Sequence, residues 1–191
     1  MIKHFISLCL LGLLVLAQGT ATAAGKWRIH PSYVGTGIQN IVDAGDKVYY
    51  LVSNNLYCLD KSTGENQSLN KVNSLNDASI TGIYYNDYKH YLMIAYADAN
   101  IDVITSNGRV VNLPDIMAAS LTSTKAINDI TFTAGGDALV ATTFGYVVYN
   151  DTKWEVKESH IYNTSISSAA VVGDYVLLSA GSNIYYGKAG T

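Results

Sequence analysis

The stretch from Ile127 to Asn150, INDITFTAGGDALVATTFGYVVYN, contains three short apolar runs separated by two turns. The runs are rich in Val, Ile, Thr, Tyr and Phe, which is typical of β-strands. Gly135-Gly136-Asp137 and Phe144-Gly145 lie between the runs, and glycine accepts the positive φ angles that tight turns require. We therefore predict an antiparallel meander of three strands. Its strands are almost as apolar on one face as on the other, so the meander needs neighbours on both faces.

The same order of apolar runs and turns occurs four times along the chain. The repeats begin at Ile38, Ile80, Ile127 and Ile166, at intervals of 42, 47 and 39 residues. A period near 40 to 45 residues with several strands in each unit is typical of a β-propeller, in which each repeat forms one blade. An outer strand faces solvent and is more polar, and three repeats continue into such a run, around residues 65–69, 109–113 and 154–158. The prediction is an all-β fold, a β-propeller.

The repeats argue against two other architectures. A β-sandwich also consists of short strands and regular turns, but it does not require one three-run pattern to recur four times. Helices are disfavoured because apolar spacing of three and four residues is not sustained anywhere in the repeats. The strongest helical candidate is the stretch Leu113–Lys125, where Pro114-Asp115 could open a single turn, and we interpret it as a connection between blades.

The ends of the chain leave two possibilities for ring closure. The fourth repeat has no outer strand before Thr191, and the segment Trp27–His30 has no blade of its own. An N-terminal strand that completed the last blade would close a four-bladed ring without free edges. The alternative, which we favour, is that the four repeats are part of a longer, seven-bladed ring.

Residues 1–23 are predicted to be a secretory signal peptide, which leaves residues 24–191 for the propeller blades. Lys3 and His4 precede the apolar run Phe5–Ala17, and Ala21-Thr22-Ala23 is a small-residue cleavage site. An uncleaved anchor helix is the alternative, but the 13 apolar residues fall short of the roughly 20 that span a bilayer. Cys9 lies inside the apolar run, so it is not read as a lipoprotein cysteine. We expect export to the periplasm or the outer-membrane surface.

The composition excludes one class of partner and suits an exported β protein. Charged residues make up 14% of the chain, the formal net charge is −3, and there are 15 tyrosines. Without a basic patch, nucleic acid binding has no electrostatic basis. After removal of the signal peptide, Cys58 is the only cysteine, so no internal disulfide is expected. Cys58 lies in the apolar run 56–59 and is predicted to be a small buried core residue.

No catalytic, cofactor-binding or metal-binding residue is predicted. The sequence has no nucleophile elbow, zinc-protease motif, Cys-x-x-Cys pair or phosphate loop. Gly35-Thr36-Gly37 is interpreted as a turn. Three histidines show no ligand spacing: His30, His90 and His160. The run Asp98–Asp102 resembles the start of a calcium loop, but it lacks the required glycine at the sixth position and the glutamate at the twelfth; Asp102 is expected instead to accept backbone N–H groups between blades.

Tyrosine pairs and turn residues are the candidate contact surfaces. Adjacent tyrosines on a strand point to opposite faces, so one ring of each pair is expected to face each neighbouring blade. Packing is the expected role, and a platform for stacking sugars is the alternative. Propellers usually bind through their loops and central channel. The pairs are Tyr49-Tyr50, Tyr84-Tyr85 and Tyr185-Tyr186, and the candidate loops are Asn54-Asn55, residues 97–100 and residues 142–144.

The blocks 52–60 and 141–150 resemble the repeats of the two-component-regulator propellers of Bacteroidetes. The chain is more similar to the N-terminal propellers of PorZ-type proteins of the type IX secretion system. This closer similarity covers essentially the whole mature chain, and it is carried by Trp27, Asp46–Tyr49, Leu69–Leu75, Ile94–Ile104 and Ile127–Ile130.

The PorZ resemblance implies a non-enzymatic surface component that works with the sortase complex and is associated with delivery of anionic lipopolysaccharide. Members of the family normally have two propellers and a small C-terminal β-domain, whereas this chain ends within the first propeller. Since the shared motifs are blade-packing motifs, the resemblance transfers no functional residue to this chain.

Two other functions are alternatives. The first is the glycan-sensing periplasmic propeller of a hybrid two-component regulator, which would be followed by a membrane helix and a kinase. The second is an exported lyase or hydrolase, which needs a rim cluster of His, Arg, Asp or Glu that the sequence does not show. We rank the secretion component first and the enzyme last.

Overall fold

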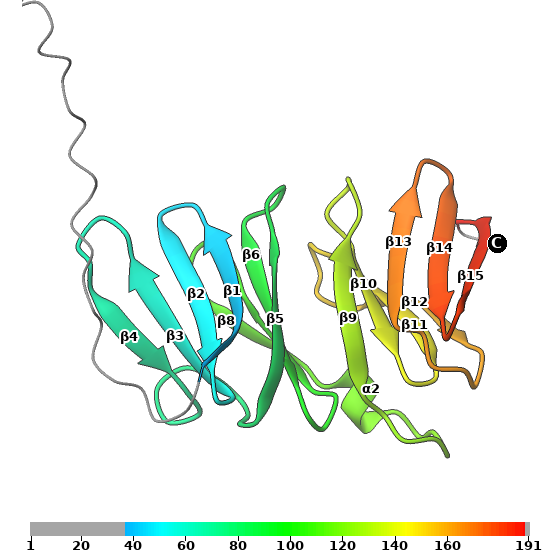
Figure 1. Cartoon of the computed structure of the whole chain (residues 1–191), viewed down its shortest axis with the longest axis horizontal. Helices are drawn as coiled ribbons and strands as arrows, with labels where there is room; N and C mark the ends of the chain where they lie inside the picture. Colours follow the sequence, from blue (N-terminus) through cyan, green and yellow to red (C-terminus); the bar gives the residue numbers. More distant parts are fainter. Residues whose placement is uncertain (1–36, 190–191) are drawn as a thin grey trace, which may run out of the picture. The chain divides into compact units, whose positions relative to one another are not determined.

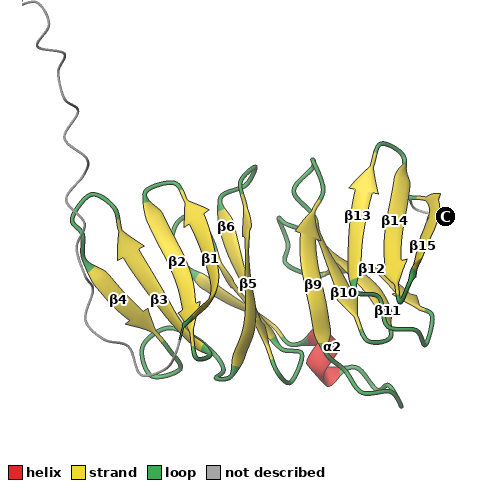
Figure 2. Cartoon of the chain, viewed as in Figure 1, coloured by secondary structure: helices red, strands yellow, loops and turns green. Residues whose placement is uncertain are grey.

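The structure is a computed structural model, and it describes residues 37–189. These residues form four antiparallel sheets that follow one another along the chain (Figure 1). Figure 2 shows that strands joined by turns make up most of the described residues. The predicted signal peptide, the turn Gly35–Gly37 and the segment Trp27–His30 lie outside the described residues or at their edge, and their predictions stay untested.

Each sheet is a meander in which every strand pairs with the next one along the chain. The first sheet contains β1 (Ile38–Ala44), β2 (Lys47–Val52), β3 (Asn55–Asp60) and β4 (Asn66–Leu69). The second contains β5 (Ile80–Asn86), β6 (Tyr91–Tyr96), β7 (Ile101–Ile104) and β8 (Val110–Leu113). The third contains β9 (Ile127–Phe132), β10 (Ala138–Thr142), β11 (Gly145–Tyr149) and β12 (Val156–Ile161). The fourth contains β13 (Ser168–Val172), β14 (Tyr175–Ala180) and β15 (Asn183–Lys188). Each sequence repeat is therefore one blade, and the fold is all-β, a partial β-propeller, as predicted.

Two predicted strand starts are displaced, each for a visible reason. The fourth inner strand begins at Ser168 and not at Ile166, because the Ile166 N–H donates to the Thr142 carbonyl of the third sheet at 2.9 Å. The third outer strand begins at Val156 and not at Trp154. Trp154 still belongs to the preceding turn, where its φ is 58° and its N–H donates to the Asn150 carbonyl at 3.1 Å.

The connection between the second and third sheets contains the single helical turn that Pro114-Asp115 could open. This turn is α2 (Asp115–Ala118), and it buries Ile116 against the core. Lys125 fixes the rest of the connection, because its ammonium group donates to the carbonyl oxygens of Met117 and Ala119. The stretch is thus a connection with one helical turn, which agrees with its interpretation from the sequence.

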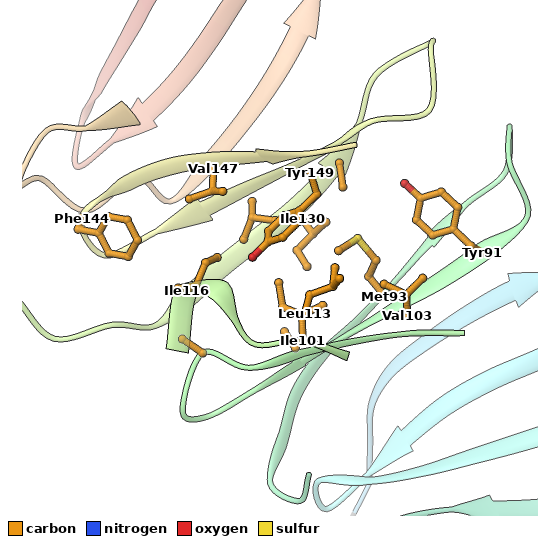
Figure 3. Packing of buried hydrophobic residues seen from close by; sticks show 14 residues of the cluster. Tyr91, Met93, Ile101, Val103, Leu113, Ile116, Ile130, Phe144, Val147 and Tyr149 are labelled. Carbon is orange, nitrogen blue, oxygen red and sulfur yellow. The ribbon is translucent and has the colours of Figure 1, made fainter. Parts of the chain in front are cut away.

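Strand β6 explains why the inner strands are apolar on both faces. All six of its side chains are buried, and alternate residues of a strand point to opposite faces. Leu92, Ile94 and Tyr96 join the core cluster shared with the first sheet. The intervening residues join the cluster shared with the third sheet, which Figure 3 shows in close-up: Tyr91, Met93 and Ala95. The second blade is therefore packed between two neighbours, which supply the hydrophobic surfaces that cover both of its faces.

The inner strands β1, β5, β9 and β13 lie next to one another in that order. Polar side chains link them: the Asn40 amide donates to the Ile83 carbonyl at 3.2 Å, and the Asn128 amide donates to the Ile166 carbonyl at 2.7 Å. The isoleucines that open the repeats are not equivalent, since Ile38 is 60% exposed whereas Ile80 is 3% exposed.

Candidate functional site

Asp102 on β7 is the most completely enclosed charged side chain of the described blades, with no exposed surface. Its Oδ2 accepts a hydrogen bond from the backbone N–H of Asn76 and another from the Tyr96 hydroxyl, each at 2.7 Å. Its Oδ1 accepts from the side-chain amides of Asn76 and Asn112, each at 2.9 Å. Asn76 belongs to the connection between the first and second sheets. The carboxylate thus ties that connection to the second blade, which confirms its structural role, although only one of the four donors is a backbone N–H as predicted.

The three loops predicted as binding surfaces lie between the second and third strands of their blades. Much of their polar surface is used internally. The Asn54 amide donates to the Ile80 carbonyl of the next blade at 2.7 Å, Asn100 is 4% exposed, and Thr142 and Phe144 are buried. The side chains of this set that remain at the surface are Asn54, Asn55, Ala97, Asp98 and, in part, Thr143.

The tyrosine pairs divide between packing and exposure. Tyr84 packs against the cluster shared by the second and third sheets, and Tyr85 packs against the cluster shared by the first and second. This is the predicted arrangement, with one ring toward each neighbour. The last pair differs, because Tyr185 is 54% and Tyr186 is 78% exposed.

The two described histidines, His90 and His160, occupy different blades, and His30 lies outside the described residues. His90 faces the Tyr85 hydroxyl at 3.3 Å, whereas His160 stacks on the Tyr146 ring with a centroid separation of 4.5 Å. Within residues 37–189, no three His, Cys, Asp or Glu side chains converge to hold a metal ion. Asp98, at the start of the calcium-like run, accepts the Asn100 N–H at 3.0 Å, as expected of a turn.

Cys58 is half-buried and lies at the margin of the core, so its predicted full burial is wrong. It packs against the cluster between the first and second sheets. It also lines a cavity of about 480 Å³ between these sheets, together with Tyr49, Tyr85 and His90. Burial raises the pKa of the Cys58 thiol, which keeps the thiol protonated and unreactive at neutral pH.

Sequence reasoning did not find this cavity. Its walls come from separate repeats: the turn 44–47 and Cys58 belong to the first, whereas Tyr85, His90 and the turn 105–108 belong to the second. One local signal was available at His90. It stands four residues after Asn86, as Gly64 stands four residues after Asp60 in the turn between β3 and β4 of the first sheet.

The family model described as the type IX secretion system PorZ N-terminal β-propeller domain matches residues 48–191. The chain belongs to this PorZ propeller family. The match spans all four sheets from β2 onward, so the same residues that form the blades carry the family assignment.

Solved structures with the same fold include PorZ of Porphyromonas gingivalis, described as an essential bacterial surface component of the type IX secretion system. The TM-score is 0.73 and the identity 23%, over 82% of this chain and 21% of that chain. Two structures of the extracellular domain of BT4673 from B. thetaiotaomicron are also similar, each with a TM-score of 0.66. That protein is described as a putative one-component system in one and as a putative hybrid two-component system in the other. Their identities are 17% and 16%, over 83% and 86% of this chain and 22% of each of those chains.

The chain therefore spans about one fifth of the length of these solved structures. At identities below 25%, these similarities show the fold. No curated protein matches the sequence significantly. Among the described residues, no helix is long and apolar enough to span a bilayer.

Proposed function

We propose that this chain is the propeller of a cell-surface component of type IX secretion, which acts without catalysis as a scaffold of the sortase attachment complex. In this proposal the parent protein takes part in delivering anionic lipopolysaccharide to the sortase. The family match over residues 48–191 is the observation that carries the proposal. The likeness to a surface component of the same secretion system supports it.

The polar groups of the blades support a scaffold over an enzyme. The buried carboxylate of Asp102 is used to hold a connection. Carboxylates at the turns form ion pairs with neighbouring lysines, as in Lys157–Asp137 at 2.8 Å and Lys61–Asp43 at 2.5 Å. These charged groups hold turns and connections in place. Such structural roles are what a scaffold requires when it presents blade edges and loops to other proteins.

The test is deletion of the parent gene in the bacterium that carries it. Cargo proteins should then appear in the medium without attachment to the cell surface, and the intact gene should restore attachment. A matched complementation with a gene encoding Asp102→Ala, which targets blade stability, should restore attachment poorly. Normal attachment of cargo in the deletion strain would refute the proposal.

Export is the second part of the proposal. Residues 1–23 are proposed to be removed on translocation, so the mature protein should begin at Ala24. Mass spectrometry of the N-terminal peptide from the envelope fraction measures this directly. A mature N-terminus at Met1 would show that the apolar run is retained and that the export signal is misassigned.

The second candidate function is the sensor propeller of a hybrid two-component regulator, and the fold likeness to the BT4673 domain favours it. A sensor should control transcription of genes for glycan use. Deletion of the parent gene should then abolish glycan-induced transcription and leave cargo attachment unchanged, which is the opposite outcome to the one expected for a secretion component.

A further inference from the structure

A cavity of about 440 Å³ lies between the third and fourth blades, and its lining carries no charged side chain. Ile166, Leu178 and Ala180 give it an apolar base, and two tyrosines stand at its surface. Tyr162 follows β12 and is 49% exposed, whereas Tyr185 lies on β15 and is 54% exposed. Single exposed aromatic residues are common on proteins, but here two from different blades line one cavity.

The Tyr162 side of the cavity is held in place by backbone and ring contacts. The Tyr162 N–H donates to the Phe144 carbonyl at 2.9 Å, which fixes the start of the loop after β12. Its ring continues a row of aromatic rings: Tyr146 stacks on His160 at 4.5 Å, and His160 lies 6.4 Å from Tyr162 with an interplanar angle of 28°. The His160 imidazole is held in turn by Glu158 at 3.1 Å.

The Tyr185 side is set by strand register. Tyr185 pairs with Leu178 across β14 and β15, so the two side chains share a face of the fourth sheet. Leu178 packs against the cluster shared with the third sheet. Tyr185 is therefore directed to the third blade and to the same cavity as Tyr162.

The lining favours one class of ligand. Tyrosine rings combine a flat apolar face with a polar hydroxyl, and a pyranose ring has an apolar face bordered by hydroxyl groups that donate and accept hydrogen bonds. Tyr162, Thr164 and Tyr185, which line the cavity, each carry a hydroxyl group. An acidic sugar would lack a cationic partner among the lining residues. The volume also lies within the range of small-ligand sites, about 300–1,000 Å³.

We propose that this cavity binds a neutral saccharide, whose pyranose ring stacks on Tyr162 or Tyr185. The inference rests on the proposed function only for the source of the sugar, which could be the polysaccharide of a lipopolysaccharide. The binding itself depends on the cavity alone, so the two proposals can fail separately.

The experiment is saturation-transfer difference NMR of the chain with a panel of neutral disaccharides containing glucose, mannose, galactose or N-acetylglucosamine. At least one should bind, with the strongest saturation on the protons of one ring face, and its uronic acid counterpart should bind more weakly. Tyr162→Ala and Tyr185→Ala should each weaken binding by about three- to tenfold. Tyr185→Phe should retain most of the affinity, because it keeps the ring.

Tyr88→Ala is the matched control, since Tyr88 is 69% exposed in the turn after β5 and lies outside this cavity. It should leave binding unchanged. Circular dichroism of each variant establishes that the blades remain folded. A second arm compares polysaccharide released from lipopolysaccharide with neutral plant oligosaccharides, which separates the two sources of the same chemistry.

Three results would overturn the inference. The first is the absence of binding by every neutral saccharide in the panel at millimolar concentration. The second is equal binding by the wild-type chain and both alanine variants. The third is occupation of the cavity by an apolar peptide that no saccharide displaces, which would make the cavity a protein-docking surface.

Discussion

Gly145 begins β11 in a backbone conformation that other residues rarely adopt, with φ at 151°. A Cβ atom at this position would lie 1.9 Å from the His160 carbonyl oxygen of the neighbouring strand. The sequence predicted a turn glycine here, and the structure adds the second constraint, which is the close approach of β12. Any side chain at residue 145 must therefore push two paired strands apart.

We expect Gly145→Val to lower the free energy of unfolding by about 3 kcal/mol or more, because it combines a strained φ with a backbone clash. Thermal and urea unfolding followed by circular dichroism measure the change. Gly173→Ala is the control, because the φ of Gly173 is 59° and nothing lies within 4 Å of an added Cβ. This variant should lose only the roughly 1 kcal/mol that a left-handed backbone conformation costs a residue with a Cβ atom. Equal losses for the two variants would show that the contact with β12 does not matter.

Three turns share one hydrogen-bonding pattern and have different residues at the fifth position. In each, an Asp or Asn side chain accepts the N–H groups two and three residues later, and the fifth residue has a positive φ. In the first turn, the Ser62 hydroxyl and the N–H groups of Thr63 and Ser62 lower the pKa of Asp60 to about 2. The fifth residues are Gly64, His90 and Trp154, with φ of 72°, 55° and 58°.

Substitution of His90 and of Trp154 by glycine should change the free energy of unfolding in opposite directions. His90→Gly should raise the free energy of unfolding by about 1 kcal/mol, since a left-handed conformation is unfavourable for residues with a Cβ. Trp154→Gly should lower it by about 2 kcal/mol, because Trp154 packs edge-on against Tyr91 at 4.9 Å. Chemical denaturation of both variants measures these changes. Destabilisation by His90→Gly would show that its contact with Tyr85 outweighs the strain.

Among the connections between blades, the one before β5 depends on Asp102. Four donors point to a carboxylate that has no contact with solvent. Removing the acceptor would leave the buried Tyr96 hydroxyl without this partner and would release both donors of Asn76. An unsatisfied buried group costs about 1–3 kcal/mol.

Asp102→Ala should therefore reduce the free energy of unfolding by about 3 kcal/mol or more, whereas Tyr96→Phe, which removes one donor, should reduce it by about 1 kcal/mol. In the double variant the loss should be smaller than the sum, because both changes remove the same hydrogen bond. Urea titrations of the three variants give these numbers. Strict additivity would mean that the Tyr96 hydroxyl does not stabilise the carboxylate.

The blades could be predicted from the sequence because their signal is periodic and local. Apolar runs, turn glycines and the interval between Ile38, Ile80 and Ile127 all lie within or between consecutive repeats. The start of the fourth inner strand was displaced because Ile166 is engaged by Thr142 of another sheet, which no local pattern records. The two cavities could not be predicted for the same reason, because each is lined by residues of two different repeats. Cys58 and His90 line one cavity, and Tyr162 and Tyr185 line the other.

Adjacent blades are held together by buried aromatic residues, and this makes the assembly sensitive to alkali. Burial raises the pKa of the hydroxyl groups of Tyr49, Tyr91, Tyr96 and Tyr149 above their ordinary value. Burial also raises the pKa of Tyr84 to about 12. In the unfolded chain a tyrosine loses its proton near pH 10. The native state therefore holds more protons than the unfolded state above that pH, and its stability must fall as pH rises.

We expect a stability plateau below pH 10 and a steep loss between about pH 10 and 12. Tyrosinate absorbance at 295 nm should rise together with the loss of the far-ultraviolet circular dichroism signal, because the buried rings ionise only when the blades separate. In Tyr84→Phe, the free energy of unfolding should fall less steeply with pH, by the equivalent of about one proton released on unfolding. The substitution removes one ionisable hydroxyl group and keeps the packed ring. Ionisation of all tyrosines before any loss of the strand signal would show that the rings between blades are open to solvent, and with it that neighbouring blades do not bury each other's faces.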